Sequence, residues 1–275
     1  MNRHHRPPLL PAALATALAG AVATSAGAQN QAESQQADCA GVPGHGDLTQ
    51  VLREVVAPGD PNANGGLGNH MWAAVVNRAG VVCAITYSGD DFGDQWPGSR
   101  TIAAEKAFTA NAFSLPGFAL STANLYWPSQ PDNSLYALAT SNPVHEEAFY
   151  FGEAASWGTQ EDPVIGRRVG GTMVFGGGLA LYDDSGELVG GLGVSGDESC
   201  TDHVIAWKVR YTLNLDHVPA GVIKAKDDNI VHDLSVDPAT GRMQSASGYG
   251  HPTCSPSAAT IAEGLSDELP TGPEE

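Results

Sequence analysis

Two segments with helical patterning carry polar side chains that could do chemistry. In the helix expected over residues 99–114, Lys106 lies in the middle of an otherwise apolar, alanine-rich face. Such a lysine either extends its ammonium group to the edge of the domain or contacts a ligand, and its small neighbours leave room above the helix. Thr109 borders the same face, where a hydrogen bond to its own helix backbone is the simpler interpretation.

A second helix, expected from Ser199 to about residue 213, carries His203 and Arg210 beside an apolar stripe. A neutral imidazole binds metals well, so His203 is the candidate metal ligand, although a single histidine on a helix flank is more often only hydrogen-bonded. Asp202 is explained by capping, because residues 199–202 fit a capping box. The histidines at positions 45, 70, 145, 217, 232 and 251 show no H-x-x-x-H or H-x-H spacing, so a dedicated zinc site is not expected.

Three further patterns are weaker signals of chemistry. The glycines at 170–171 and 176–178 precede no predicted helix, so turns between strands are favoured over a phosphate-binding loop. Ser195 stands in G-V-S-G-D, which lacks the second glycine of a nucleophile elbow. The acidic loop 88–94 could hold Ca²⁺, but it lacks a later bidentate glutamate, and a solvated loop is favoured.

The elements that must position these side chains are short β-rich runs and helices. The β-rich runs are residues 70–76, 81–87, 172–175, 179–182 and 187–194. Further helices are expected over residues 47–56 and 119–126. Neighbouring runs joined by tight turns pair antiparallel. The sequence therefore predicts a single α+β domain with a five-stranded antiparallel sheet flanked by helices.

The N-terminal residues are typical of a secretory signal peptide. Arg3 and Arg6 precede an Ala/Leu-rich run that ends in A-G-A at residues 26–28, and this run is too short for a spanning helix. Cleavage there predicts a periplasmic or secreted protein with no membrane segment. The remaining boundaries are a flexible segment over 29–39, the domain over 40–254 and an acidic disordered tail over 255–275.

The charge balance argues against one class of partner. The chain has 13 Lys and Arg against 31 Asp and Glu, a formal charge of −18. Such a protein repels phosphate backbones, so nucleic acid is not an expected partner.

All four cysteines lie in the part predicted to be exported, where disulfides are favoured over free thiols. Three pairings are possible. We expect Cys39–Cys254 and Cys83–Cys200, because the first two bracket the folded region and the second two sit in predicted core elements. A metal site is a weaker alternative, since no C-x-x-C spacing is present.

Four segments taken together resemble the GlcG/HbpS family of haem-binding and haem-degrading domains. They are A-A-V-V-N-R-A-G (73–80), A-A-E-K-A-F-T-A (103–110), G-G-T-M-V-F-G-G-G (170–178) and V-G-G-L-G-V-S-G (189–196). The resemblance covers roughly residues 70–215. It implies a profilin-like five-stranded sheet and assembly into homo-oligomers.

The resemblance also implies haem as cofactor and a pocket formed by Lys106, Thr109, Gly177 and Ser195, with His203 as the candidate iron ligand. The cations that would pair with haem propionates are Lys106, Arg100 and Arg210. The chain departs from the family at Leu179-Ala180, where proline often follows the glycines. It departs again at Asp202-His203, where Asp-Glu is usual, and in the long insertion over residues 119–168.

The leading hypothesis is an exported protein that binds a small ligand, haem, in a sensing, sequestering or oxidative-stress role. The first alternative is an enzyme acting on haem or a small hydroxy acid, although no acid/base pair or nucleophile is visible. The second is an oligomeric scaffold, which a large apolar surface patch without a pocket would support.

Overall fold

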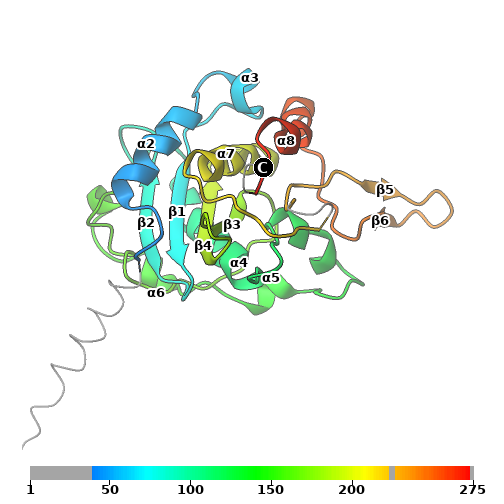
Figure 1. Cartoon of the computed structure of the whole chain (residues 1–275), viewed down its shortest axis with the longest axis horizontal. Helices are drawn as coiled ribbons and strands as arrows, with labels where there is room; N and C mark the ends of the chain where they lie inside the picture. The colour runs from blue at the N-terminus through cyan, green and yellow to red at the C-terminus, as the bar shows by residue number, and fades with distance from the viewer. Residues whose placement is uncertain (1–38, 223–226, 273–275) are drawn as a thin grey trace, which may run out of the picture.

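The computed structural model describes residues 39–222 and 227–272, so the expected signal peptide and nearly all of the segment over 29–39 lie outside the described residues. A four-stranded sheet forms the centre (Figure 1). Its order is β2-β1-β4-β3, and every pair is antiparallel. The strands are β1 (Trp72–Asn77), β2 (Val82–Tyr87), β3 (Gly178–Tyr182) and β4 (Leu188–Ser195). The α+β class and the antiparallel pairing are confirmed, but the sheet has four strands where five were predicted.

The missing strand is the β-rich run over residues 172–175, which forms no strand. Its backbone groups bond to side chains in place of a neighbouring strand. The Met173 N–H donates to Thr109 Oγ1 (3.0 Å), and the Phe175 carbonyl accepts from Thr122 Oγ1 (2.7 Å). Met173, Val174 and Phe175 are only half-buried, and periodicity alone does not distinguish such a run from a strand.

Helix α4 (Ser99–Phe113) covers one face of the sheet, while α2 (His45–Val55) and α7 (Ser199–Thr212) cover the other. Glycines in β4 allow α4 to approach closely. A Cβ at Gly193 would lie 1.9 Å from the Ala103 carbonyl oxygen, and one at Gly191 would lie 2.2 Å from that of Ala107. The alternating residues Leu192 and Val194 pack on the opposite face with α7. The small-residue pattern in β4 and α4 therefore fixes the position of Lys106 against the sheet.

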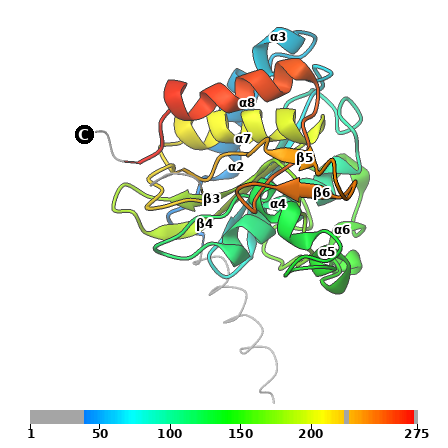
Figure 2. The ribbon, with the colours of Figure 1, turned by 90° about the vertical axis from the view of Figure 1, so that its right-hand side faces the viewer.

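The expected disordered tail over 255–275 is wrong for most of its length, because residues Pro256–Glu268 form helix α8. Ser255 caps the helix by accepting from the Ala258 N–H, and proline follows at its first position. Ala258, Ala262 and Leu265 are buried in the same core as α7. Figure 2 shows α8 lying along α7. Apolar residues at helical spacing, with a serine cap, were the sequence signal that a compositional reading missed.

The predicted disulfide pairing is also wrong. The bonds are Cys39–Cys83 and Cys200–Cys254. Cys39, at the start of the domain, bonds to Cys83 on β2. Cys254, at its end, bonds to Cys200 in the first turn of α7. Cys39 and Cys254 bracket the domain in sequence but not in space, because each segment returns to a different element.

The other elements are short. They are α3 (Pro61–Asn64), η1 (Ala123–Leu125), η2 (Trp127–Ser129), α5 (Leu138–Ser141), α6 (Glu146–Phe149), η3 (Ala154–Ser156), β5 (Leu234–Val236) and β6 (Met243–Ser245). The helix expected over 119–126 is thus reduced to a 3₁₀ turn. Strands β5 and β6 form a hairpin that projects from the body (Figure 1). Across residues 39–222 and 227–272, no helix has the length and apolar character needed to span a bilayer.

Candidate functional site

Lys106 is fully buried where α4, β4 and the start of α7 meet. Its Nζ donates to Asp202 Oδ2 (2.6 Å) and to the Val194 carbonyl (3.0 Å), and the Phe175 ring centre lies 4.8 Å away. Asp202 Oδ1 accepts from the N–H groups of residues 196 and 197, so this carboxylate does not form the predicted capping box. Burial lowers the pKa of Lys106, and Asp202 opposes that shift. The ammonium group therefore links α4, β4 and α7 inside the protein.

The glycine run lies directly over this ion pair. Gly177 has φ +110°, and a Cβ there would lie 2.8 Å from Lys106 Nζ and 2.5 Å from the Val194 carbonyl oxygen. Ser195 ends β4 beside it and is buried. Thr109 donates to the Glu105 carbonyl of its own helix (2.7 Å), as the simpler interpretation of this residue predicted. The structure brings Lys106, Gly177 and Ser195 together, but it fills the space among them with protein atoms.

Arg100 and Arg210 each pair with an internal carboxylate. Arg100 bonds through two nitrogens to Asp162 and through a third to the Phe149 carbonyl (2.7 Å). Arg210 forms two bonds to Asp228 (2.7 and 2.8 Å). The two arginines are 2% and 0% exposed. A ligand anion would have to displace a bidentate carboxylate to reach either guanidinium group.

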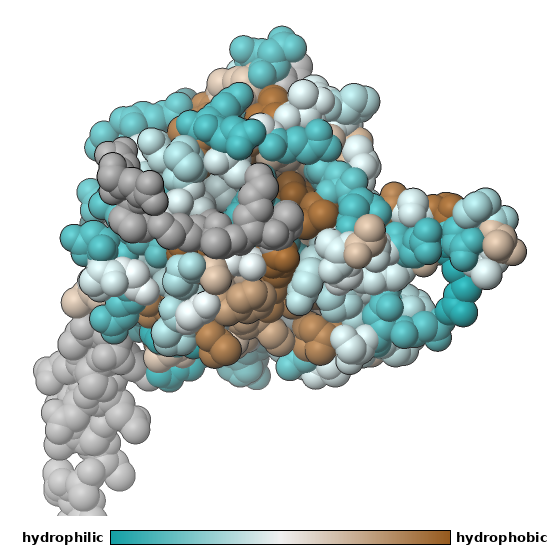
Figure 3. Space-filling model, turned by 45° about the vertical axis from the view of Figure 1, so that its right-hand side comes forward, coloured by the Kyte–Doolittle hydropathy of each residue, from teal (hydrophilic) through white to brown (hydrophobic). Residues whose placement is uncertain are grey.

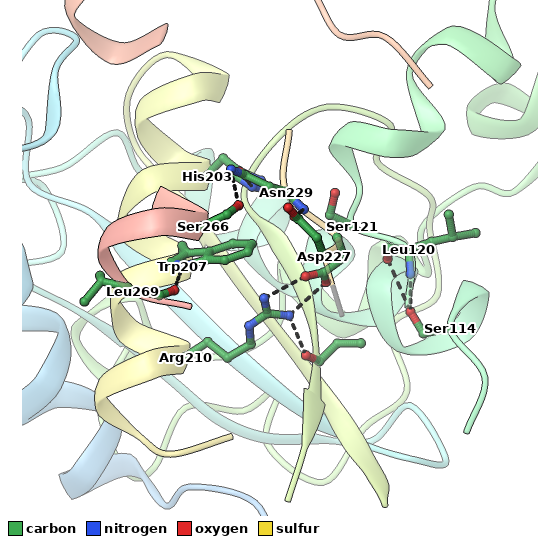
Figure 4. Close-up of polar contacts among 12 residues, drawn as sticks. Ser114, Leu120, Ser121, His203, Trp207, Arg210, Asp227, Asn229, Ser266 and Leu269 are labelled. Atoms are coloured by element: carbon green, nitrogen blue, oxygen red, sulfur yellow. Dashed lines mark hydrogen bonds and ion pairs between the residues drawn. The ribbon is translucent and has the colours of Figure 1, made fainter. Parts of the chain in front are cut away.

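His203 is fully buried on α7 and is held by an asparagine (Figure 4). Asn229 directs its amide nitrogen to the Ala262 carbonyl (2.8 Å) and Ser266 Oγ (3.1 Å), so its oxygen faces His203 Nε2 at 3.1 Å. Nε2 also lies 3.2 Å from the Ile230 N–H, and Nδ1 is buried with no hydrogen-bond partner among the described residues. Burial, followed by the charge of Arg210, holds the pKa of His203 well below its usual range. This imidazole is neutral at pH 7.

His203, His232 and His251 form what we call the histidine cluster. The rings of His232 and His251 lie 6.3 Å apart, and the charges of both residues lower the pKa of His203. Burial lowers the pKa of His251 to about 4 and also lowers that of His232. Both ring nitrogens of His232 are buried without a hydrogen-bond partner of ordinary geometry among the described residues. Histidine spacing could not predict the cluster, because its members come from α7 and two separate C-terminal segments.

An apolar groove of about 430 Å³ adjoins the histidine cluster. It is lined by Leu120, Leu125, Trp127, Pro128, Asn133, Ser134, Leu135, Ser247, Gly248 and Tyr249. The Tyr126 ring, between two lining residues, packs 5.3 Å from the His251 ring, and Tyr249 is two residues from His251. Figure 3 shows apolar side chains gathered between the body and the projecting hairpin. We call this hollow the aromatic groove.

The rim of the aromatic groove carries an exposed ion pair. Asp132, next to the lining residue Asn133, contacts Arg242 of the β5–β6 hairpin, and both side chains are about 70% exposed. Two further hollows, of about 460 and 520 Å³, lie beside α2 and beside the β1–β2 turn. Neither is lined by a residue predicted from the sequence to bind a ligand.

Comparison with known proteins gives one family and a set of distant structures. Residues 62–210, more than half of the chain, match the family described as "Haem degrading protein HbpS-like". The crystal structure of the PduOC:heme complex is similar at 24% identity and a TM-score of 0.41, covering 62% of this chain and 91% of that one. The structure of HbpS is similar at 20% identity and 0.37, covering 62% and 86%. Klebsiella pneumoniae protein ORFY gives 19% and 0.37, covering 65% and 85%.

None of the curated proteins compared with the chain matches it. The family match ends at residue 210, before two members of the histidine cluster and one wall of the aromatic groove. Asn229, His232 and His251 thus belong to a C-terminal extension that this chain adds to the matched region.

Proposed function

Because the chain belongs to the HbpS-like family of haem-degrading proteins, we propose that it binds haem, and that the haem lies in the aromatic groove with His232 as iron ligand. The observation that carries the proposal is that neither ring nitrogen of His232 has a hydrogen-bond partner of ordinary geometry in the described part of the chain, while its neighbour His251, 6.3 Å away ring to ring, packs against Tyr126 at the edge of the apolar groove. Leaving such nitrogens unpaired costs free energy, about 1–3 kcal/mol for a buried polar group, and a metal-bearing ligand would remove that cost.

The residues present fit haem in three respects. The groove is walled by Trp127, Tyr249 and leucines, and its volume lies in the range of small-ligand pockets. The lowered pKa of His232 keeps its imidazole neutral, which is the form that binds iron. Bound haem would supply an iron centre whose potential depends on its axial ligand and on burial. This chain's own residues would orient the ring and exclude water from it.

The proposal assigns different roles to the cations than the sequence predicted. Lys106, Arg100 and Arg210 hold internal carboxylates, so they support the fold around the site. Arg242 pairs with Asp132 in solvent, where an ion pair contributes only about 0–1 kcal/mol. A haem propionate could therefore replace Asp132 at Arg242 with little loss.

The proposal includes export and self-association. Two disulfides support an oxidising compartment, and the haem would be sensed or sequestered there. N-terminal sequencing of the protein recovered outside the cytoplasm should find residue 29 first, and sedimentation should find a homo-oligomer.

A hemin titration of the oxidised full-length protein tests the site. We expect one hemin per chain with a Soret band, and His232→Ala should weaken binding at least tenfold. His145→Ala is the matched control, because His145 is exposed and lines no part of the groove. His203→Ala tests the site expected from the sequence. Absence of stoichiometric binding at micromolar protein, or equal affinity of His232→Ala and wild type, would refute the proposal.

A further inference from the structure

The Cys200–Cys254 disulfide lies next to His251, and the two together have the composition of a metal site. The two sulfur atoms and a ring nitrogen of His251 all lie within 4.8 Å of one another. We propose that reduction of this disulfide creates a metal site in which Cys200, Cys254 and His251 bind one zinc-class ion. The inference is independent of haem binding, because it concerns the reduced protein and residues outside the aromatic groove.

The His251 ring is already oriented as a metal ligand. Its Nδ1–H donates to the Pro252 carbonyl (2.8 Å), which leaves the lone pair on Nε2. Nε2 lies 3.4 Å from Ser199 Oγ, and the same hydroxyl lies 3.5 Å from Cys254 Sγ. Nε2 also accepts from the Gly176 N–H at 3.3 Å, and an ion held between this nitrogen and the two sulfur atoms would take the place of that hydrogen bond. A backbone carbonyl on the second nitrogen is the usual support for a metal-bound imidazole.

The position of the cysteines favours thiolates after reduction. Cys254 Sγ accepts from the Cys200 N–H at 3.2 Å, and Cys200 lies in the first turn of α7. The N-terminal end of a helix stabilises a thiolate by its free N–H groups and its dipole. The thiolate, not the thiol, is the form that binds metals.

The chemistry balances with a dithiol as reductant. The dithiol transfers two electrons and two protons to the Cys200–Cys254 bond and becomes a disulfide, while two protein thiols form. Binding of Zn²⁺ then releases these two thiol protons to solvent. The sulfur atoms must separate to lie about 2.3 Å from the ion, with the imidazole nitrogen at about 2.0 Å. Ser199 Oγ or a water completes a tetrahedral set.

This disulfide differs from the other one in the chain. Among residues 39–222 and 227–272, Cys200, His251 and Cys254 are the one cluster of three such ligand side chains close enough to share an ion. Cys39–Cys83 therefore serves as an internal control. Either a disulfide or a bound metal would keep residue 254 against α7, so the C-terminal extension would remain attached to the domain in both states.

Cobalt titration tests the inference, because Co²⁺ bound to thiolate shows a charge-transfer band that Co²⁺ bound to histidine alone lacks. The full-length protein is reduced with a water-soluble phosphine under anaerobic conditions and titrated with Co²⁺. We expect one Co²⁺ per chain with a thiolate band that Zn²⁺ abolishes by competition. The oxidised protein should show no such band. Cys39→Ser/Cys83→Ser should behave as wild type.

Two variants separate the proposed ligands from folding effects. Cys254→Ser should lose the band. His251→Gln keeps its disulfide until reduction, so it can be checked for folding first, and it should bind Co²⁺ at least about tenfold more weakly. No thiolate band in reduced wild type, a band that survives in Cys254→Ser, or an unchanged affinity in His251→Gln would each overturn the inference.

Discussion

Replacing Lys106 tests whether a residue of the family motif stabilises the fold or contacts the ligand. Lys106→Met keeps the length of the side chain but leaves the Asp202 carboxylate buried without its cation. Removing one partner of a buried ion pair costs about 3–5 kcal/mol. Asp202 would keep two backbone N–H donors, so the lower end of that range applies. We expect the free energy of unfolding to fall by about 3 kcal/mol.

A second variant also removes the Asp202 carboxylate charge that Lys106→Met leaves without a partner. In Lys106→Met/Asp202→Asn, the asparagine oxygen can still accept from the two N–H groups, and no ion remains buried. A charge pair replaced as a whole often costs little. The double variant should therefore be more stable than Lys106→Met alone, with a coupling energy between the two sites of at least about 1 kcal/mol.

Urea unfolding of wild type, Lys106→Met, Asp202→Asn and the double variant at pH 7 measures these differences, with equal slopes as the check on two-state behaviour. Hemin affinity is then measured in urea-free buffer, where Lys106→Met remains folded. The affinity should change by less than about threefold, because Lys106 contacts no part of the aromatic groove. Additive unfolding energies would refute the ion-pair argument. A large loss of hemin affinity in folded Lys106→Met would show that the lysine contacts the ligand.

Three further perturbations follow from the same contacts. Burial raises the pKa of Glu105 to about 7, so the folded state loses stability as pH rises from 4.5 to 7. Glu105→Gln should therefore raise Tm at pH 8 and leave it unchanged at pH 4, and equal shifts of Tm at the two pH values would contradict this. Gly177→Ala should destabilise the protein by at least about 2 kcal/mol in urea unfolding, because its φ of +110° and three close contacts disfavour a Cβ, and a neutral effect would contradict the close packing. Arg242→Ala should weaken hemin binding a few-fold at low salt and less at high salt, and an effect independent of salt would exclude a charge contact.

Local sequence patterns predicted the elements that depend on nearest neighbours. The hairpin of β1 and β2 followed from two β-rich runs around a four-residue turn, and α4 and α7 followed from their helical composition. The run over 172–175 failed because its partners, Thr109 and Thr122, are side chains distant in sequence. Helix α8 failed because an acidic, proline-containing composition outweighed a capped, amphipathic pattern.

The candidate site was predicted in part. The resemblance grouped Lys106, Gly177 and Ser195, and these residues lie near one another because motif segments that pack on one another stay together; their role in ligand binding stays a prediction. It could not indicate that His251, which belongs to the C-terminal extension beyond the matched region, accepts from the Gly176 N–H beside this junction. Histidines that meet only through tertiary folding leave no spacing in the sequence.

The acidic composition explains why the cations were misread. With 31 carboxylates against 13 cations, a basic side chain that becomes buried has many possible acidic partners and few competitors. Burial of an unpaired charge is costly, so each buried cation needs such a partner. Lys106, Arg100 and Arg210 each have one, and none of these three is left to hold a ligand anion. In such a protein the groups free to bind a metal-bearing ligand are neutral ones, and buried imidazoles with unpartnered nitrogens meet that requirement.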